Sequence, residues 1–222
     1  KTVPSTPPMR APIGIVPHTI RRIVAFVRPS IRFEPNENFD LTLIGEWQQN
    51  VGGPATSQNI VNPVFPKLAQ TLFLYTPPAD KYDVRHNLQG YSNSETKQLA
   101  LEANWNLGHG LVTAVAGWRD VEFLSSTDFD GSPITLFHFK DNKEEQDQRS
   151  VELRYASSFS DRYRFTVGTF WFDQSFFVGE RRETFGGIVA GNPVIANTAG
   201  ITNQDQDNVS VFAEGSYDFT AQ

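Results

Sequence analysis

The chain has 222 residues and a formal net charge of −6, with 25 acidic side chains against 19 Lys and Arg. This balance gives no basic surface of the kind that binds nucleic acid. The lack of cysteine excludes disulfides, thiolate metal sites and cysteine nucleophiles. No run of about 18 apolar residues occurs, so no transmembrane helix is predicted. The 18 Phe, 16 Gly and 14 Pro favour many short strands with punctuating loops over a helical protein.

Residues 1–22 are Pro-rich and show no clear period, so they are left unassigned, as a loop or a damaged first strand. No apolar segment with a small-residue cleavage site opens the chain, so no signal peptide is predicted. The Arg21-Arg22 pair suggests a twin-arginine signal, but no suitable apolar stretch follows it. We expect the chain either to be mature or to have been cut from something longer.

The first predicted hairpin begins at Ile23, where the sequence takes a period of two. Residues 23–34 place apolar side chains such as Phe33 on one face and Arg, Ser and Glu on the other. Residues 35–38, Pro-Asn-Glu-Asn, have strong turn chemistry, because Pro presets φ and Asn tolerates the left-handed region. The chain then returns over residues 39–48 with the same alternation, which predicts one wet and one apolar face.

A second hairpin is predicted from residues 94–107 and 111–124, with Gly108-His109-Gly110 as its turn. A helix over residues 94–105 is the alternative, because Ser94 can cap it and Leu, Ala, Glu and Lys are good helix formers. Strict alternation that runs into a glycine-flanked turn favours the strand.

Three more strands complete the pattern. Alternating residues around 150–155 lead through a turn at 159–162 to a strand over residues 163–178. A last alternating strand starts near Asn208. The sequence therefore predicts about seven strands.

The connections between these strands alternate between tight turns and long polar stretches, the latter at residues 50–93, 125–146 and 179–206. Outer-membrane barrels have short periplasmic turns and long extracellular loops. The predicted strands have about 11 to 16 residues, whereas a tilted strand crosses the hydrocarbon layer with about 9–11 and soluble strands have about five or six. The pattern predicts an all-β, antiparallel up-and-down transmembrane β-barrel segment, with the tight turns at the periplasmic rim.

Two groups of side chains fit this interpretation. Aromatic residues near strand ends are expected at the headgroup level, although they also suit the core of a soluble sandwich; they are Phe39, Trp47, Trp105, Tyr163, Trp171, Tyr217 and Phe219. A second group of charged residues is expected to face the lumen with a structural role, because a charge facing lipid is costly. These are Arg32, Glu46, Glu102, Arg119, Glu152, Arg154 and Glu214.

Three segments resemble barrel strands of TonB-dependent outer-membrane receptors. The first is Arg28-Pro-Ser-Ile-Arg-Phe-Glu-Pro-Asn-Glu-Asn-Phe-Asp-Leu-Thr-Leu43, an arginine-bearing strand that ends in a Pro-containing turn before a Leu-Thr-Leu strand. The second is Gln148-Arg-Ser-Val-Glu-Leu-Arg-Tyr155, followed by Gly168-Thr-Phe-Trp-Phe172. The third is Asn208-Val-Ser-Val-Phe-Ala-Glu-Gly-Ser-Tyr-Asp-Phe-Thr220. The resemblance covers most of residues 23–222.

The resemblance implies a barrel of twenty-two strands with an N-terminal plug, which takes up ferric siderophores, cobalamin or glycans with energy passed on by TonB. This chain departs from that pattern, since it has about a third of the strands and no plug-like segment, TonB box or closing strand. Residues 23–222 are therefore expected to form part of such a barrel. Outer-membrane lipid, a plug domain, TonB and a ferric siderophore or other small nutrient are the partners that the resemblance implies, and the location is the bacterial outer membrane.

The sequence contains no motif for catalysis, a metal or another cofactor, and residues that bind ligand stay unknown. His18, His86, His109 and His138 are far apart without metal-ligand spacing, so solvated histidines are expected. Residues 128–131, Asp-Phe-Asp-Gly, have a faint similarity to a calcium loop but lack the third acidic ligand and the distal Glu. The acidic pair at 205 and 207 is weaker still. The charge run at 143–147 is expected at a solvated junction between loop and strand.

The leading interpretation is a non-enzymatic transport protein, namely a wall segment of a TonB-dependent receptor. A general porin is the first alternative, and a plug encoded upstream would exclude it. A soluble β-sandwich that binds glycans is the second, and it predicts a monomer without detergent. Seven strands alone would leave two open edges and an apolar surface, which predicts aggregation in water.

Overall fold

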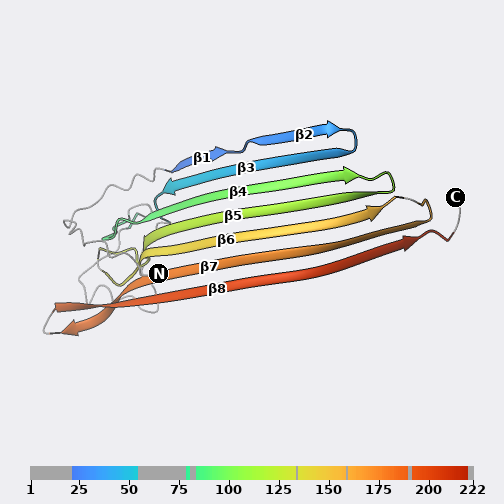
Figure 1. The fold of residues 1–222 in the computed structure, drawn as a ribbon. Coiled ribbons are helices and arrows are strands. Elements are labelled where there is room, and N and C mark those ends of the chain that lie inside the picture. Colours follow the sequence, from blue (N-terminus) through green and yellow to red (C-terminus); the bar gives the residue numbers. More distant parts are fainter. Residues whose placement is uncertain are drawn as a thin grey trace.

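The computed structural model describes residues 22–54, 79–80, 84–133, 135–158, 160–189 and 192–219. These residues form an all-β fold, with eight antiparallel strands in one sheet (Figure 1). The described part of the chain contains no helix long and apolar enough to span a membrane. The Pro-rich lead-in at 1–21 and most of the predicted connection 50–93 lie outside the described residues.

The strands follow one another across the sheet in the order β1-β3-β4-β5-β6-β7-β8. Strand β2 follows β1 in the chain and also pairs with β3. Their bounds are β1 Ile23–Val27, β2 Ser30–Asn36, β3 Phe39–Gly52, β4 Tyr91–Asn106, β5 Gly110–Asp128, β6 Phe137–Ser157, β7 Tyr163–Val189 and β8 Asn192–Tyr217. The predicted up-and-down arrangement of about seven strands is confirmed, and the sheet is open, with β1–β2 and β8 at its edges.

The first predicted strand is interrupted at Arg28 and Pro29. Proline has no backbone N–H to give to the ladder, so strand pairing stops there. The carbonyl of Pro29 still accepts a hydrogen bond from the backbone N–H of Gly45 at 3.0 Å, which keeps both pieces against β3. Strand β2 then continues to Asn36, whose side chain accepts a hydrogen bond from the N–H of Asn38 at 2.9 Å and closes the turn.

The three tight turns lie where the sequence predicts them, together at one end of the sheet. In the second turn, Gly108 has a φ of 81°, which favours glycine, and its N–H donates to the Asn106 side chain at 2.9 Å. The helical alternative for residues 94–105 is wrong, because these residues pair in register with both β3 and β5.

Two of the three long connections are much shorter than predicted. Strand β5 extends to Asp128 and β6 starts at Phe137, so only residues 129–136 connect them. Strands β7 and β8 pair from Tyr163–Tyr217 to Val189–Asn192, so most of the predicted loop 179–206 is a hairpin, and the charge run 143–147 lies inside β6. These segments lack apolar alternation, but strand pairing uses backbone groups and does not require it.

Strand β6 carries one extra residue near this end of the sheet. Its pairing with β5 shifts between Ser125 and Thr127, and its pairing with β7 shifts between Phe139 and Lys143. Asp141 lies in this stretch with a φ of 49°, a left-handed conformation that asparagine and aspartate tolerate best among residues with a side chain. The shift is a β-bulge.

The register places apolar side chains in rows on one face of the sheet. We call this set the apolar band: Phe39, Leu41, Leu43, Leu99, Leu101, Ala103, Trp105, Val112, Ala114, Ala116, Trp118, Val151, Leu153, Tyr155, Val167, Trp171, Val209, Val211 and Ala213. No second layer covers it among the described residues, and Leu153, Val209 and Val211 are 48, 71 and 81% exposed. The charged residues expected to share a face lie together on the opposite one.

On the opposite face, the Phe212 ring packs closely over Gly168, and a mutation can test this contact. A Cβ added to Gly168 would lie 2.9 Å from the carbonyl oxygen of Leu153 and against the Phe212 ring. We expect Gly168→Ala to lower the free energy of unfolding by about 1–3 kcal/mol, the usual cost of overpacking, as measured by urea titration followed by Trp fluorescence.

The matched control is Gly200→Ala on β8, where an added Cβ meets nothing within 4 Å. It should change stability by less than about 0.5 kcal/mol. Equal effects of the two variants would contradict the close packing of Phe212 over Gly168.

Candidate functional site

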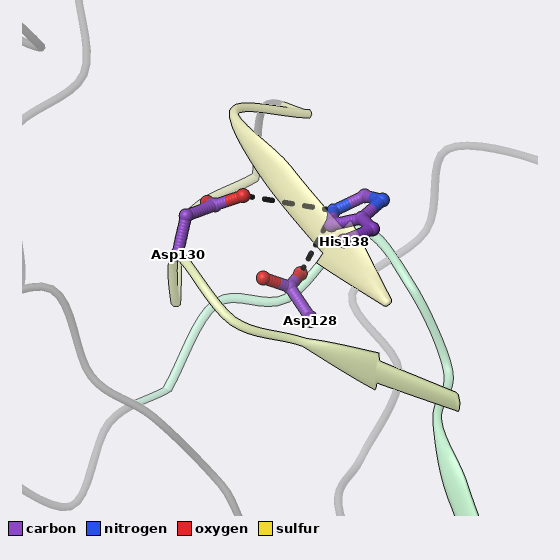
Figure 2. A group of neighbouring side chains, drawn as sticks. All are labelled: Asp128, Asp130 and His138. Atoms are coloured by element: carbon purple, nitrogen blue, oxygen red, sulfur yellow. Dashed lines mark ion pairs between the residues drawn. The ribbon is translucent and has the colours of Figure 1, made fainter. Parts of the chain in front are cut away.

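A cluster of charged side chains lies at the end of the sheet away from the tight turns, at the connection between β5 and β6. Asp128 pairs with His138 across these strands, and His138 pairs in turn with Glu183 on β7. Asp130 belongs to the connection between β5 and β6 and turns back toward His138 (Figure 2). We refer to Asp128, Asp130 and His138 as the carboxylate–histidine cluster.

The two aspartates are held by backbone amides of their own connection. Asp128 accepts from the N–H of Gly131 at 3.0 Å, and Gly131 has a φ of 64°, which favours glycine. Asp130 accepts at one oxygen from the N–H and hydroxyl of Ser132. Its other oxygen accepts from the N–H groups of Leu136 at 3.0 Å and Phe137 at 2.8 Å. Backbone groups of residues 131–137 thus hold Asp130 and one oxygen of Asp128.

His138 lies between the two aspartates and is only 2% exposed. Its Nε2 atom is 3.6 Å from Oδ2 of Asp128 and 3.7 Å from Oδ2 of Asp130, as Figure 2 shows. On the other side, its Nδ1 is 3.6 Å from Oε2 of Glu183. Glu183 also pairs with Lys140, at 2.9 Å. Three carboxylates thus surround one buried imidazole.

The segment before β4 covers this cluster. The N–H of Asn87 donates to Oδ2 of Asp128 at 3.1 Å, and its side-chain nitrogen donates to the Thr135 hydroxyl at 2.9 Å. In this orientation the amide oxygen faces Asp128 and His138. Turned over, the amide nitrogen donates to Nε2 of His138 at 2.9 Å and to Oδ2 of Asp128 at 3.1 Å, while the oxygen accepts from Thr135. The turned amide satisfies all of these contacts when Nε2 of His138 carries no proton.

The electrostatics of the cluster favour a positive charge at His138. Burial alone would lower the pKa of His138, but the contact with Asp128 and its negative charge, with the charges of Asp130 and Glu183, outweigh it and raise the pKa. Burial would likewise raise the pKa of Asp128, but His138 and the N–H of Gly131 lower it. The cluster can stabilise a proton or a metal ion at Nε2.

These three residues could hold a metal, because one ligand atom of each lies within 4.8 Å of the others.

The expectation that His138 is solvated is wrong, because residues from the segment before β4 and from β7 cover it. These covering residues are remote from His138 in the sequence. His109 is exposed in its turn, as expected, and contacts the Tyr155 hydroxyl at 2.9 Å. His86 is half-buried, and its charge contributes to the lowered pKa of Asp128. His18 lies outside the described residues.

The faint calcium-loop pattern at 128–131 marks the right turn but misses the histidine. The available signal was the spacing of two aspartates followed by His138 between two Phe residues, 137 and 139. Asp205 and Asp207 are exposed on β8 and belong to no such cluster among the described residues.

Loss of the Asp130 carboxylate should loosen the connection between β5 and β6. We expect Asp130→Ala to remove the acceptor of the Leu136 and Phe137 N–H groups and to destabilise the local structure by about 1.5–3 kcal/mol, the value of a hydrogen bond to a charged group. Hydrogen exchange of the amides of residues 132, 136 and 137, whose N–H groups donate to Asp130, measures this. Asp207→Ala, on exposed β8, is the control; unchanged exchange in Asp130→Ala would contradict the role of this carboxylate.

Tyr91 gives a test by pH at the same end of the sheet. Burial and the hydrogen bond that its hydroxyl donates to Asp141, at 2.9 Å, raise the pKa of Tyr91 to about 12. Because the folded-state pKa is raised, the stabilisation is present below pH 10 and is lost as the pH rises through about 12.

An ultraviolet titration of the wild type minus that of Tyr91→Phe should show one phenol with a midpoint near 12. Asp141→Asn should lower that midpoint toward the ordinary tyrosine value. A Tyr91 midpoint at the ordinary value in the wild type would contradict the contact with Asp141.

Comparison with known proteins gives no relative from which a function can be taken: no family model, no curated protein and no solved structure matches the chain.

Proposed function

We propose that this chain is a wall segment of an outer-membrane β-barrel of the TonB-dependent receptor type, which takes up a scarce nutrient such as a ferric siderophore. The observation that carries the proposal is the apolar band, an exposed set of apolar side chains on one face of a single-layered sheet. A water-facing sheet would need a second layer over such a face, whereas lipid covers it directly.

The height of the apolar band suits a lipid bilayer. On β7 this face runs from Tyr163 to Trp171, and a tilted strand crosses the hydrocarbon layer with about 9–11 residues. On strands β6 to β8, the next row away from the turns carries Arg149, Asp173 and Asp207, in line with Trp118 on β5. Charges therefore begin where the lipid headgroups would begin.

Two tryptophans support this boundary. Trp47 and Trp118 lie at the edge of the band, and their indole N–H groups donate to Glu95 at 2.8 Å and to Asp147 at 2.9 Å. A ring in the apolar layer with its N–H bonded to a polar group outside it is the arrangement typical of membrane interfaces. Tyr163 and Tyr217 lie opposite each other at the turn end of the same face.

The opposite face suits a water-filled lumen. Across neighbouring strands it carries Glu102 and Glu152 in one row and Arg154 in the next, and Arg154 pairs with Glu152 at 3.6 Å. Arg28, between β1 and β2, pairs with Glu46 of β3 at 3.5 Å. Charges on this side escape the cost of facing lipid.

The open edges suit an arc of a larger barrel. In the described part of the chain, strands β1, β2 and β8 leave backbone groups without a neighbouring strand, and a barrel removes such edges by closing on itself. Further strands, a plug domain and TonB are the partners that this proposal assigns to the full-length protein. The turns would face the periplasm, and the long hairpin of β7 and β8 would project outward to help form the vestibule that meets the nutrient.

The lipid-facing assignment is tested by moving an arginine from one face to the other. Val167→Arg, in the middle row of the apolar band on β7, should cost about 2–4 kcal/mol at mid-membrane and reduce the amount of folded protein in the outer-membrane fraction. Val115→Arg is the matched control, because Val115 lies on the opposite face between Glu102 and Glu152. Equal losses for both variants, in the gene product that contains this chain, would contradict a lipid-facing band.

Uptake is tested separately in the cell. Deletion of the gene should prevent growth on a ferric siderophore under iron limitation, and the same defect should follow from loss of TonB. Growth that depends on the gene but not on TonB would favour a general porin and refute the receptor assignment.

A further inference from the structure

We propose that Asp128, Asp130 and His138 bind a divalent transition-metal ion, with Zn²⁺ the best match, and that this ion joins the 129–136 connection to strand β6. The proposal is independent of uptake, because it rests on side chains beyond the apolar band. The metal would be a structural cross-link at the end of the sheet away from the tight turns.

The spacing of the ligand atoms suits a shared cation better than hydrogen bonds. Nε2 of His138 is 3.6 and 3.7 Å from the two aspartate oxygens, longer than the usual 2.7–3.2 Å of an N–H···O hydrogen bond. A zinc ion about 2.0–2.2 Å from each of its ligand atoms separates them by roughly 3.3–3.7 Å in a tetrahedral or more open geometry. The nitrogen also points between the two carboxylates, as Figure 2 shows.

The donor set selects the class of metal. One imidazole nitrogen and two carboxylate oxygens are ligands of Zn²⁺ and similar first-row ions. Ca²⁺ and Mg²⁺ take oxygen ligands, so the central histidine disfavours both. Two aspartate charges would balance a divalent ion in a cluster that excludes water, since His138 and Asp128 are 2 and 1% exposed.

The surroundings hold the ligands in place in the way that metal sites require. Glu183 lies on the Nδ1 side of His138, where a carboxylate usually orients a metal-bound histidine, at an ion-pair distance of 3.6 Å that is longer than a hydrogen bond. Lys140 fixes Glu183 at 2.9 Å. Backbone amides of the connection orient Asp130. The ring and both carboxylates are thus set before an ion arrives.

Asn87 supplies a further acceptor. When its nitrogen donates to Thr135, its oxygen faces Asp128 and His138. Four acceptors then converge, an arrangement that repels itself unless a cation lies among them. The turned amide instead donates to both neighbours and satisfies a metal-free cluster with a neutral histidine. Metal binding should therefore turn the Asn87 amide.

The experiment measures binding of Zn²⁺, and of Co²⁺ as a coloured probe, to the full chain in detergent micelles after treatment with a chelator. Calorimetry should give one Zn²⁺ per chain, and Co²⁺ should give a visible absorbance typical of a site with few ligands. His138→Gln should weaken Zn²⁺ binding by about 100-fold or more, and Glu183→Gln by about 10–100-fold through loss of orientation.

Two controls separate this site from surface binding. His109→Gln removes an exposed turn histidine and Asp205→Asn an exposed carboxylate of β8, so both should keep the wild-type affinity. Zn²⁺ should also slow proteolysis within residues 129–136 of the wild type and of both controls, but not of His138→Gln.

Absence of stoichiometric Zn²⁺ binding to a wild-type chain with an intact sheet would overturn the proposal and leave a protonated His138 as the cation of the cluster. Equal weakening by His138→Gln and His109→Gln would overturn it as well. Neither result bears on the apolar band or on uptake, which are measured by the arginine variants and by growth.

Discussion

The two faces of the sheet depend on the register of the cross-strand pairs. Between β3 and β8 this register has no shift from the tight turns to the edge of the apolar band. It aligns Leu43, Leu101, Val151 and Val209 in one row, with alanine and tryptophan between them. Because side chains alternate along a strand, a slip of one residue would bring side chains of the opposite face, such as Glu102 and Glu152, into such a row. The tight turns set this register, since each leaves few ways to align the strands that it joins.

The two ends of the sheet are stabilised by different interactions. Near the turns, the strands pair in register through their backbones, and the exposed apolar band is stable only when lipid or another apolar surface covers it. At the far end, the β5–β6 connection is organised by carboxylates that accept backbone N–H groups, and its cover comes from the segment around Asn87. Buried polar groups in such a network are stable only when all of them are satisfied. This end is therefore satisfied either by a cation at His138 or by an Asn87 amide that donates to His138 and Asp128.

The sequence predicted the elements whose signals are local. Alternation and turn residues such as Pro35 and Gly108 located the three hairpins and the apolar face. The outer part of β7 and β8 was missed, because Asn203, Gln204 and their neighbours pair through backbone groups with a partner strand that periodicity cannot detect. The burial of His138 was missed for a similar reason, since it depends on Asn87 and Glu183, which are remote in sequence.

The extra residue in β6 determines which side chain of that strand lies opposite Asp128. The shift near Asp141 brings His138 opposite Asp128 and Glu183. If the pairing of residues 125 and 142 continued without the shift, Phe139 would occupy that position and the imidazole would point to the other face. One inserted residue thus selects an ionisable ring over a phenyl ring. A deletion there would change the chemistry of the cluster without altering any of its three side chains.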